Sequence, residues 1–299
     1  MSPLAKADRP ILITGGTGQV GSELLKLLTP VGPVVAPNRS ELDLANPASI
    51  RAVLRDFEPV LILNAGAYTA VDKAESEPDL CHAINAEAPR VLATEARDID
   101  AALIHYSTDY VFDGLKAAPY VEDDPAAPLN AYGRAKAVGE QSVLAFGGAT
   151  LVLRCSWVYS LHGKNFLTTM LGLRHKPQLA IVDDQHGAPT CASAIAASTC
   201  AIIAAARSSA SGMQDFIAIH SGIYHLSAAG RTSWKGFAEE IFRTVDGTRP
   251  RVEGISTEEY GAPAHRPRNS VLDNSKIATT FGIQMPSWEA QLKNCVDHK

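Results

Sequence analysis

The segment Tyr132-Gly133-Arg134-Ala135-Lys136 places a phenol and an ammonium group four residues apart. On a helix this spacing brings both side chains to one face. A free tyrosine has a pKa of about 10 and exchanges protons poorly at neutral pH. Because a positive charge about 5 Å away favours the phenolate by roughly 3 kcal/mol at an effective dielectric of about 20, the pattern predicts that Lys136 lowers the pKa of Tyr132 and makes it a general acid or base. The same spacing also occurs on solvated helices, so its meaning depends on the elements before it.

A hydroxyl group follows the fourth predicted strand, in the segment Ser107-Thr108-Asp109-Tyr110. At the carboxyl end of a central strand, the Thr108 hydroxyl is well placed to hydrogen-bond a substrate oxygen. We therefore predict that Thr108, Tyr132 and Lys136 form one catalytic set. The alternative is three unconnected polar residues.

A glycine-rich segment follows the first predicted strand, residues 11–14. Its glycines recur every three residues and lead into a helical pattern. Such glycines permit a tight turn and let backbone N–H groups approach a pyrophosphate at the helix N-terminus. We expect this turn to bind a dinucleotide through Gly15, Gly18, Gln19 and Val20. A helix-entry turn without a ligand is the alternative.

The loop after the second predicted strand bears on the choice of cofactor. An acidic residue at this place is typical of NAD binding, whereas this chain has Pro37-Asn38-Arg39-Ser40. Arg39 with Ser40 favours the 2'-phosphate of NADPH, with NADH as the other cofactor that the site could accept; a solvated surface arginine is the alternative. Asp43 and Leu44 are placed to meet the adenine.

Strands and helices alternate through the first half of the chain, with predicted strands at residues 11–14, 34–36, 60–65, 102–107 and 150–154. This alternation predicts an α/β fold, a Rossmann-type doubly wound parallel sheet with ligands at the carboxyl ends of its strands. Pro89 interrupts the helical pattern of residues 80–97, which predicts either a new helix start capped by Asn85 or a kinked helix.

The alternation breaks down after residue 160. Helices are expected at residues 165–174, 192–206 and 233–245, strands at 179–182 and 223–226, and a loop-rich tail after them. We therefore expect a cofactor-binding Rossmann domain over residues 9–160, completed by residues 190–228. A smaller C-terminal substrate-binding domain is expected from residues 161–189 and 229–299.

The composition is that of an ordinary globular protein: 299 residues, 46% of them hydrophobic, with a net charge of -5. This charge gives no general attraction to nucleic acid or to an anionic membrane. The first ten residues are polar and no apolar run is long enough to span a bilayer, so a cytoplasmic protein is expected. The five cysteines include no CxxC pair, which argues against a disulfide framework and a zinc site.

With these motifs in place, the sequence resembles the extended short-chain dehydrogenases that act on nucleotide sugars, and within them the reductases of dTDP-L-rhamnose synthesis. The resemblance runs from residue 11 almost to the C-terminus. It rests on these segments: Thr17-Gly18-Gln19-Val20-Gly21, Asn64-Ala65-Gly66-Ala67-Tyr68-Thr69-Ala70-Val71-Asp72-Lys73-Ala74-Glu75, His105-Tyr106-Ser107-Thr108-Asp109-Tyr110-Val111-Phe112, Pro128-Leu129-Asn130-Ala131-Tyr132-Gly133, Ser156-Trp157-Val158-Tyr159, Asp184-Gln185-His186-Gly187-Ala188-Pro189-Thr190 and Arg266-Pro267-Arg268-Asn269-Ser270.

The resemblance implies NAD(P)H-dependent reduction of the 4-keto group of dTDP-4-dehydro-beta-L-rhamnose to dTDP-L-rhamnose. Tyr132 would give a proton to the developing alkoxide, Lys136 would hold the nicotinamide ribose, and Thr108 would polarise the carbonyl. The cofactor would also lie beside Ala65, Gly66 and Ala67. The residues expected to line the sugar and nucleotide site are Thr69, Val71, Thr108, Asp109, Tyr110 and Trp157.

Two roles are left open at the substrate side. An ordinary core aromatic is the alternative for Trp157, although an indole offers a flat apolar face to a ring. Arg266 suits a diphosphate but could equally tie down the C-terminal segment.

Some members of this family are described as pairing through a magnesium ion held by glutamates. Glu23 matches one such position, but Ser193 stands where another acid would be. We therefore predict no metal, and a monomer or a homodimer.

Three alternatives come from the same fold. A 4,6-dehydratase needs a carboxylic acid where this chain has Tyr110, and a C4 epimerase would prefer an acidic residue near Arg39. A non-catalytic NADP-binding subunit, resembling the regulatory partner of methionine adenosyltransferase, would not need the intact set of Thr108, Tyr132 and Lys136.

Overall fold

The computed structural model of this protein describes residues 9–245, 247 and 249–297. Residues 1–8, which include most of the polar start of the chain, lie outside the described residues. A parallel sheet of six strands forms the centre, in the order β10-β5-β4-β3-β1-β2. Its strands are β1 (Ile11–Thr14), β2 (Val34–Val35), β3 (Leu61–Asn64), β4 (Ala102–Thr108), β5 (Thr150–Cys155) and β10 (Gly222–His225).

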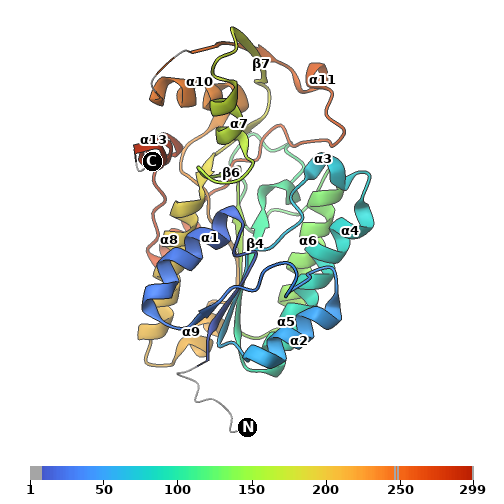
Figure 1. The fold of residues 1–299 in the computed structure, drawn as a ribbon, viewed down its shortest axis with the longest axis vertical. Helices are drawn as coiled ribbons and strands as arrows, with labels where there is room; N and C mark the ends of the chain where they lie inside the picture. The colour runs from blue at the N-terminus through green and yellow to red at the C-terminus, as the bar shows by residue number, and fades with distance from the viewer. Residues whose placement is uncertain (1–8, 246, 248, 298–299) are drawn as a thin grey trace.

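Helices cover both faces of this sheet (Figure 1), which confirms the predicted doubly wound α/β fold. Alternate strand residues enter different cores, since Ile11 and Ile13 pack in one and Leu12 in the other. Strands buried on both faces are apolar along their length for this reason. One face carries α1 (Gln19–Leu28), α8 (Ala192–Ser208) and α9 (Met213–Ile219), and the other carries α2 (Pro47–Phe57), α5 (Ala88–Asp98) and α6 (Ala131–Ala145).

The helix around Pro89 is kinked rather than restarted. A π-helical turn (Ala83–Glu87) joins α4 (Pro78–His82) to α5, and such turns bend helices without ending them. Asn85 does not cap a helix. Its side chain instead accepts from the Tyr68 N–H and donates to the Tyr68 carbonyl, both at 2.9 Å, and so holds the loop that follows β3.

The C-terminal part of the chain lies above the sheet in Figure 1. Its own core packs Phe237, Ile241 and Trp288 together. The helices and strands here are β6 (Val158–Tyr159), α7 (Phe166–Leu173), β7 (Gln178–Val182), β8 (His186–Gly187), β9 (Thr190–Cys191), β11 (Thr232–Ser233), α10 (Trp234–Thr244), β12 (Arg251–Ile255), α11 (Thr257–Tyr260) and α13 (Trp288–Asp297). Helix α12 (Ser275–Phe281) packs instead against the central sheet, where Ile277 lies in the same core as Ile11 and Ile13.

The expected loop-rich tail is confirmed only in part: residues 261–274 contain no helix or strand, but β12, α11, α12 and α13 lie elsewhere in the tail. Strand β12 pairs in parallel with β7, which lies far earlier in the chain. Pairing at such a distance leaves no local pattern in the sequence. Among the described residues, no single helix has both the length and the apolar character to cross a membrane. Taken together, α8 and α9 are long and apolar enough to do so, but the two helices are bent by 115° at the break between them.

Candidate active site

A cavity of about 780 Å³ opens beyond the carboxyl ends of β1 and β3. The chain leaves β1 towards β2 on one side and returns to β3 on the other, and ligands of open α/β sheets bind at such a switch point. All residues predicted to bind the cofactor line this cavity: Gly15, Gly18, Gln19, Val20, Arg39, Asp43, Leu44, Ala65, Gly66, Ala67, Tyr132 and Lys136.

The glycine turn is too tight to hold side chains. Gly15 has a φ of +66°, and a Cβ there would lie 2.7 Å from the Gly66 Cα. A Cβ on Gly21 would lie 2.1 Å from the Gly15 carbonyl oxygen. Helix α1 then starts after Gly18 without a side-chain cap, so its first N–H groups and the positive end of its dipole are open to an anion.

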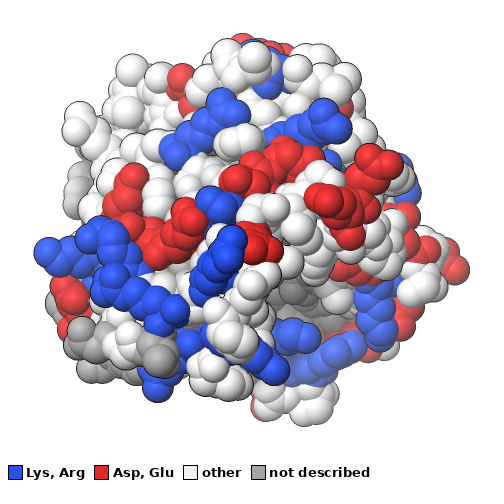
Figure 2. All heavy atoms as spheres, turned by 90° about the horizontal axis from the view of Figure 1, so that it is seen from above, with Lys and Arg blue, Asp and Glu red and all other residues white. Residues whose placement is uncertain are grey.

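Cationic side chains surround the mouth of the cavity. Arg39, Lys73 and Lys164 line it, and Lys73 forms an exposed ion pair with Glu77 at 2.6 Å. Among the described residues, Arg39 and Lys164 have no ion-pair partner. On the face that Figure 2 shows, basic and acidic side chains are interspersed. The positive charge that a phosphate needs therefore comes from the few cations that line the cavity, not from a basic surface.

Lys136 is buried on α6, with 2% of its surface exposed. Its Nζ donates to the Tyr106 carbonyl at 2.5 Å and lies 3.3 Å from Nε2 of His105. Burial lowers the pKa of Lys136 to about 8. Asn130 caps this helix by accepting from the Gly133 N–H at 2.7 Å, which sets the start of the turn that carries Tyr132.

The pKa of Tyr132 is not lowered as the sequence predicts. Burial raises this pKa, and a hydrogen bond to the Thr108 side chain only partly offsets the increase. The phenolate loses more hydration in this site than its neighbours restore. The ring also packs edge-on against Tyr110, with centroids 6.0 Å apart.

Thr108 and Asp109 form a buried unit behind Tyr132. The Thr108 hydroxyl donates to Asp109 Oδ1 at 3.0 Å, and the Ser156 hydroxyl donates to Oδ2 at 2.9 Å. Burial raises the pKa of Asp109 to about 6 against these hydrogen bonds. Neither Thr108 nor Asp109 is among the residues that line the cavity, and the substrate contact expected of Asp109 stays a prediction.

The other predicted substrate residues divide into two groups. Thr69 lines the cavity, whereas Val71, Tyr110 and Trp157 are not among its lining residues. Val71 begins the short helix α3 (Val71–Ala74). Tyr110 lies against Arg266, whose charge and hydrogen bond act on its phenol.

Arg266 ties the C-terminal segment to α3. Its guanidinium pairs with Asp72 at 2.9 Å and donates to the Ala264 carbonyl at 3.0 Å. Of the two roles that the sequence leaves open for Arg266, this ion pair is the one that the structure contains.

Trp157 lies in a stack and is only 9% exposed. Its ring is parallel to that of Trp234 within 2°, with centroids 3.5 Å apart. A Cβ on Gly187 would lie 2.4 Å from the indole, so this glycine makes room for the ring. Trp157 has a φ of 47°, which is rare for a large residue and marks a site where the surrounding structure holds the backbone.

Sequence reasoning missed two residues that line this cavity, Ser107 and Lys164, and the Trp234 ring that stacks on Trp157. Ser107 lines the cavity, and its buried hydroxyl has no hydrogen-bond partner among the described residues. Alternation along β4 could have shown that Ser107 and Thr108 point to opposite sides. Lys164 and Trp234 come from distant segments of the chain, and no local signal marks them.

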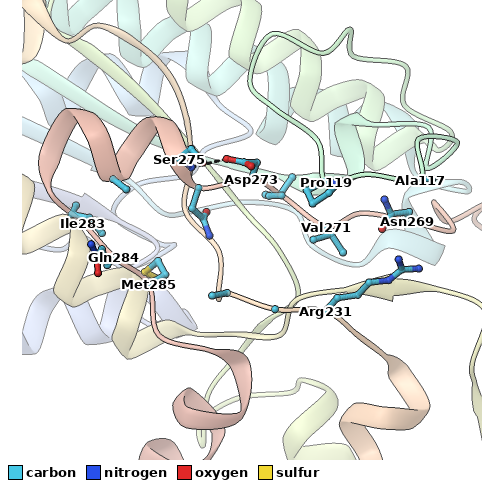
Figure 3. A pocket seen from close by; sticks show the side chains of 15 residues that line it. Ala117, Pro119, Arg231, Asn269, Val271, Asp273, Ser275, Ile283, Gln284 and Met285 are labelled. Carbon is cyan, nitrogen blue, oxygen red and sulfur yellow. Dashed lines mark hydrogen bonds between the residues drawn. The ribbon is translucent and has the colours of Figure 1, made fainter.

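A second hollow of about 500 Å³ lies beside residues 269–275. Figure 3 shows Asn269, Val271 and Asp273 on one side of it and Met285 on another. Neither the predicted catalytic residues nor the predicted cofactor residues are among those that line it.

Comparison with known proteins places this site in a family. The model of the RmlD substrate binding domain family matches residues 9–299. The dTDP-4-dehydrorhamnose reductase of Burkholderia thailandensis is 45% identical over 295 residues, which cover 96% of this chain and 97% of the relative. The enzyme of the same name from Sinorhizobium fredii is 40% identical and covers 96% of each chain.

The chain belongs to the dTDP-4-dehydrorhamnose reductase family. The crystal structure of the family member from Bacillus anthracis, in complex with NADP, is similar with a TM-score of 0.89 and 33% identity, over 98% of this chain and 100% of that one. The UDP-glucose 4-epimerase of Thermus thermophilus, in complex with NAD, has a TM-score of 0.76 at 19% identity, over 97% and 98% of the two chains. This second likeness shows the Rossmann-type fold alone.

Proposed function

We propose that this protein is an oxidoreductase that uses NADPH to reduce the 4-keto group of dTDP-4-dehydro-beta-L-rhamnose, giving dTDP-L-rhamnose. The observation that carries the proposal is that one cavity holds both the glycine turn and the Tyr132 and Lys136 side chains, in a chain that belongs to this reductase family.

The residues present fit NADPH. The glycine turn and the open N-terminus of α1 suit the pyrophosphate,. Arg39 has no competing ion pair among the described residues, so its guanidinium is available to a 2'-phosphate. The Ser107 hydroxyl lacks a partner in the described chain and is available to the nicotinamide end. The relative from Bacillus anthracis was crystallised with NADP.

When bound, NADPH supplies the hydride that reduces the 4-keto carbon. Tyr132 donates its phenolic proton to the oxygen, on which negative charge develops. The raised pKa of Tyr132 keeps the phenol protonated at neutral pH, which is the form that a reduction needs. Lys136 in its ammonium form stabilises the phenolate that remains. To polarise the substrate carbonyl, the Thr108 hydroxyl turns its hydrogen from Asp109 Oδ1 to the substrate oxygen.

The test is a spectrophotometric assay with the purified protein. The substrate dTDP-4-dehydro-L-rhamnose is made enzymatically in the cuvette, and oxidation of NADPH and NADH is followed in parallel. We expect rapid oxidation of NADPH, with dTDP-L-rhamnose as the product identified by chromatography. A folded protein that binds NADPH but does not oxidise it would instead support a sister substrate or the regulatory-subunit alternative.

The finer predictions on organisation belong to this proposal. We propose that residues 9–160 with 190–228 form the cofactor domain, and that residues 161–189 with 229–299 form the substrate domain. We also propose a cytoplasmic monomer or homodimer that binds neither nucleic acid nor membrane. The mixed charges on the face in Figure 2 support the last point.

A further inference from the structure

We propose that Trp234 and Gly187 hold Trp157 edge-on to the substrate, so that Trp157 contacts a sugar hydroxyl of the nucleotide sugar through its indole N–H and not by stacking. Trp234 is the positioning residue in this arrangement, and Trp157 is the residue that touches the substrate. The inference rests on the proposed function, since that function places a nucleotide sugar beside Trp157.

Trp234 covers one face of the Trp157 indole. The two rings are parallel within 2° and their centroids are 3.5 Å apart, which is the contact separation of two carbon atoms. The rings therefore overlap with almost no sideways offset. Because aromatic pairs prefer an offset arrangement, the surrounding chain must impose this one, and the attraction between the two rings alone does not explain it.

Gly187 covers the other face of the same indole. A Cβ on Gly187 would lie 2.4 Å from Cε2 of Trp157, 2.6 Å from Nε1 and 2.8 Å from Cζ2. An approach in the plane of the ring would bring Nε1 or Cζ2 closest, because both flank Cε2 on the outer edge. Since Cε2 is closest, Gly187 lies over the ring. The three nearest atoms all belong to Trp157 and none to Trp234, so Gly187 lies on the face that Trp234 leaves uncovered.

One pair of strands holds both residues that cover Trp157. Gly187 of β8 pairs with Thr232 of β11, and Trp234 follows β11 as the first residue of α10. The Trp234 Nε1–H donates to Gln185 Oε1 at 3.1 Å, and Gln185 is only 3% exposed. The Trp234 ring therefore cannot slide over Trp157 without breaking a buried hydrogen bond, which is costly.

The backbone of Trp157 is fixed as well as its ring. Its φ of 47° is in the left-handed region, and a large residue keeps such a conformation only where neighbouring contacts hold it. The Thr190 N–H donates to the Trp157 carbonyl at 3.2 Å, and the next residue, Val158, pairs with β9. The indole therefore has little freedom to present a face to a ligand.

One polar group of Trp157 is left for a ligand. Its Nε1–H donates to no residue that the structure describes. It is also not one of the fully buried polar atoms without a partner, which are Ser107 Oγ, Tyr159 Oη and Asn269 Oδ1. The N–H therefore lies within the 9% of this side chain that is exposed. Because an indole N–H can only donate, it selects an oxygen acceptor.

The neighbours of Trp157 in the chain indicate which part of the substrate supplies that oxygen. Ser156 donates to Asp109, which accepts from Thr108, the residue predicted to polarise the 4-keto group. On the other side, Val158 lines the cofactor cavity. Hydride transfer requires the sugar to lie between the cofactor and Thr108, so we expect a sugar hydroxyl to accept from Trp157.

The contact can be observed by ¹H–¹⁵N NMR of the indole N–H groups in the full-length protein. The chain has three tryptophans, and each signal is the one that disappears in the corresponding phenylalanine variant. On saturation with dTDP-L-rhamnose, the product of the proposed reaction, we expect the Trp157 proton to shift downfield and to exchange more slowly with water. Saturation with dTDP, which lacks the sugar, should have neither effect. An unchanged Trp157 signal in the saturated dTDP-L-rhamnose complex would overturn the proposal.

Calorimetric titrations of three variants separate positioning from packing. Trp157→Phe keeps a ring that can stack on Trp234 but loses the N–H, so we expect the Kd of dTDP-L-rhamnose to rise about fivefold and the Kd of dTDP to stay near the wild-type value. Trp234→Leu loses the stack, and we expect a similar rise for dTDP-L-rhamnose. Trp234→Phe keeps a ring over Trp157 and should restore most of the binding. The Kd of NADPH should change little in all three variants.

A purely structural role gives a different result. Trp288 is a buried tryptophan of the core against which Trp234 packs, and Trp288→Phe is the control that should keep the wild-type Kd values. If Trp234→Leu is folded but binds dTDP-L-rhamnose like the wild type, the positioning role is wrong. If Trp157→Phe weakens dTDP as much as dTDP-L-rhamnose, the sugar contact is wrong.

The outcome for the proposed function is separate, because none of these measurements needs turnover. A protein that binds dTDP-L-rhamnose with the expected Trp157 shift but does not oxidise NADPH contradicts the proposed reaction and supports this inference. A protein that oxidises NADPH with the substrate but has an unchanged Trp157 signal contradicts this inference alone. A protein that does not bind dTDP-L-rhamnose contradicts both.

Discussion

The cofactor side and the substrate side of this site are built differently. The cofactor side is an open cavity that includes the glycine turn and residues 65–67, and Arg39 and Lys164 at this cavity have no ion-pair partner among the described residues. On the substrate side, the predicted residues already engage each other: Trp157 stacks on Trp234, and Thr108 donates to Asp109. The cofactor cavity is therefore already open, whereas these predicted substrate residues are already in contact with other side chains.

Replacing Tyr132 should have the largest effect and should separate chemistry from cofactor binding. In Tyr132→Phe the phenolic proton is lost but the ring remains, so we expect kcat to fall at least a hundredfold while the Kd of NADPH changes little. Stopped-flow oxidation and fluorescence titration measure the two quantities. Tyr224→Phe, at a buried tyrosine whose hydroxyl bonds the His220 carbonyl, is the control, and equal turnover in both variants would remove Tyr132 from the mechanism.

Replacing Asp109 tests how much its buried carboxylate lowers the free energy of unfolding at neutral pH. Its pKa in the folded protein is about 6, above the ordinary 3.8, so its contribution to stability is complete below pH 4 and is lost as the pH rises through 6. Asp109→Asn should therefore be more stable than wild type at pH 7.5 by roughly 2 to 3 kcal/mol, with the difference smaller at pH 4.5. Urea unfolding at both pH values measures this, with Asp123→Asn as an exposed control; a gap that does not grow with pH contradicts it.

Replacing Arg39, which has no ion-pair partner among the described residues, tests whether its guanidinium binds the 2'-phosphate of NADPH. Arg39→Ala should raise KM for NADPH about tenfold, because a hydrogen bond to a charged group is worth about 1.5 kcal/mol or more, and should leave KM for NADH within twofold. Arg55→Ala is a matched exposed arginine that does not line the cavity. Equal changes for both cofactors would show that Arg39 does not contact the 2'-phosphate.

The smallest effect is expected from the ion pair between Asp72 and Arg266. Because the Asp72 side chain is 43% exposed, Asp72→Asn should change the free energy of unfolding by less than about 1 kcal/mol. It should also release Arg266 for a diphosphate and lower KM for the nucleotide sugar two- to threefold. Steady-state kinetics and urea unfolding check this against Glu240→Gln, which breaks the pair with Arg243 far from the cavity. A higher KM would mean that Asp72 orients Arg266 for binding.

Local patterns in the sequence were sufficient for the sheet and for the cofactor side. A strand, a glycine turn and a helix follow one another within residues 11–28, so the turn that opens at Gly15 and its ligand can be read from neighbouring residues,. The placement of the predicted phenol and ammonium on one helix is likewise local, since Tyr132 and Lys136 are four residues apart.

Contacts between distant segments were decided by the tertiary structure alone. The pairing of β12 with β7, the stacking of Trp234 on Trp157 and the approach of His105 to Lys136 each join residues that are at least 31 positions apart. The pKa of Tyr132 belongs here too: the sequence shows the lysine that would lower it, but only the packed structure shows the loss of hydration that raises it,. Spacing along the chain determines which groups can meet, and burial determines their charge.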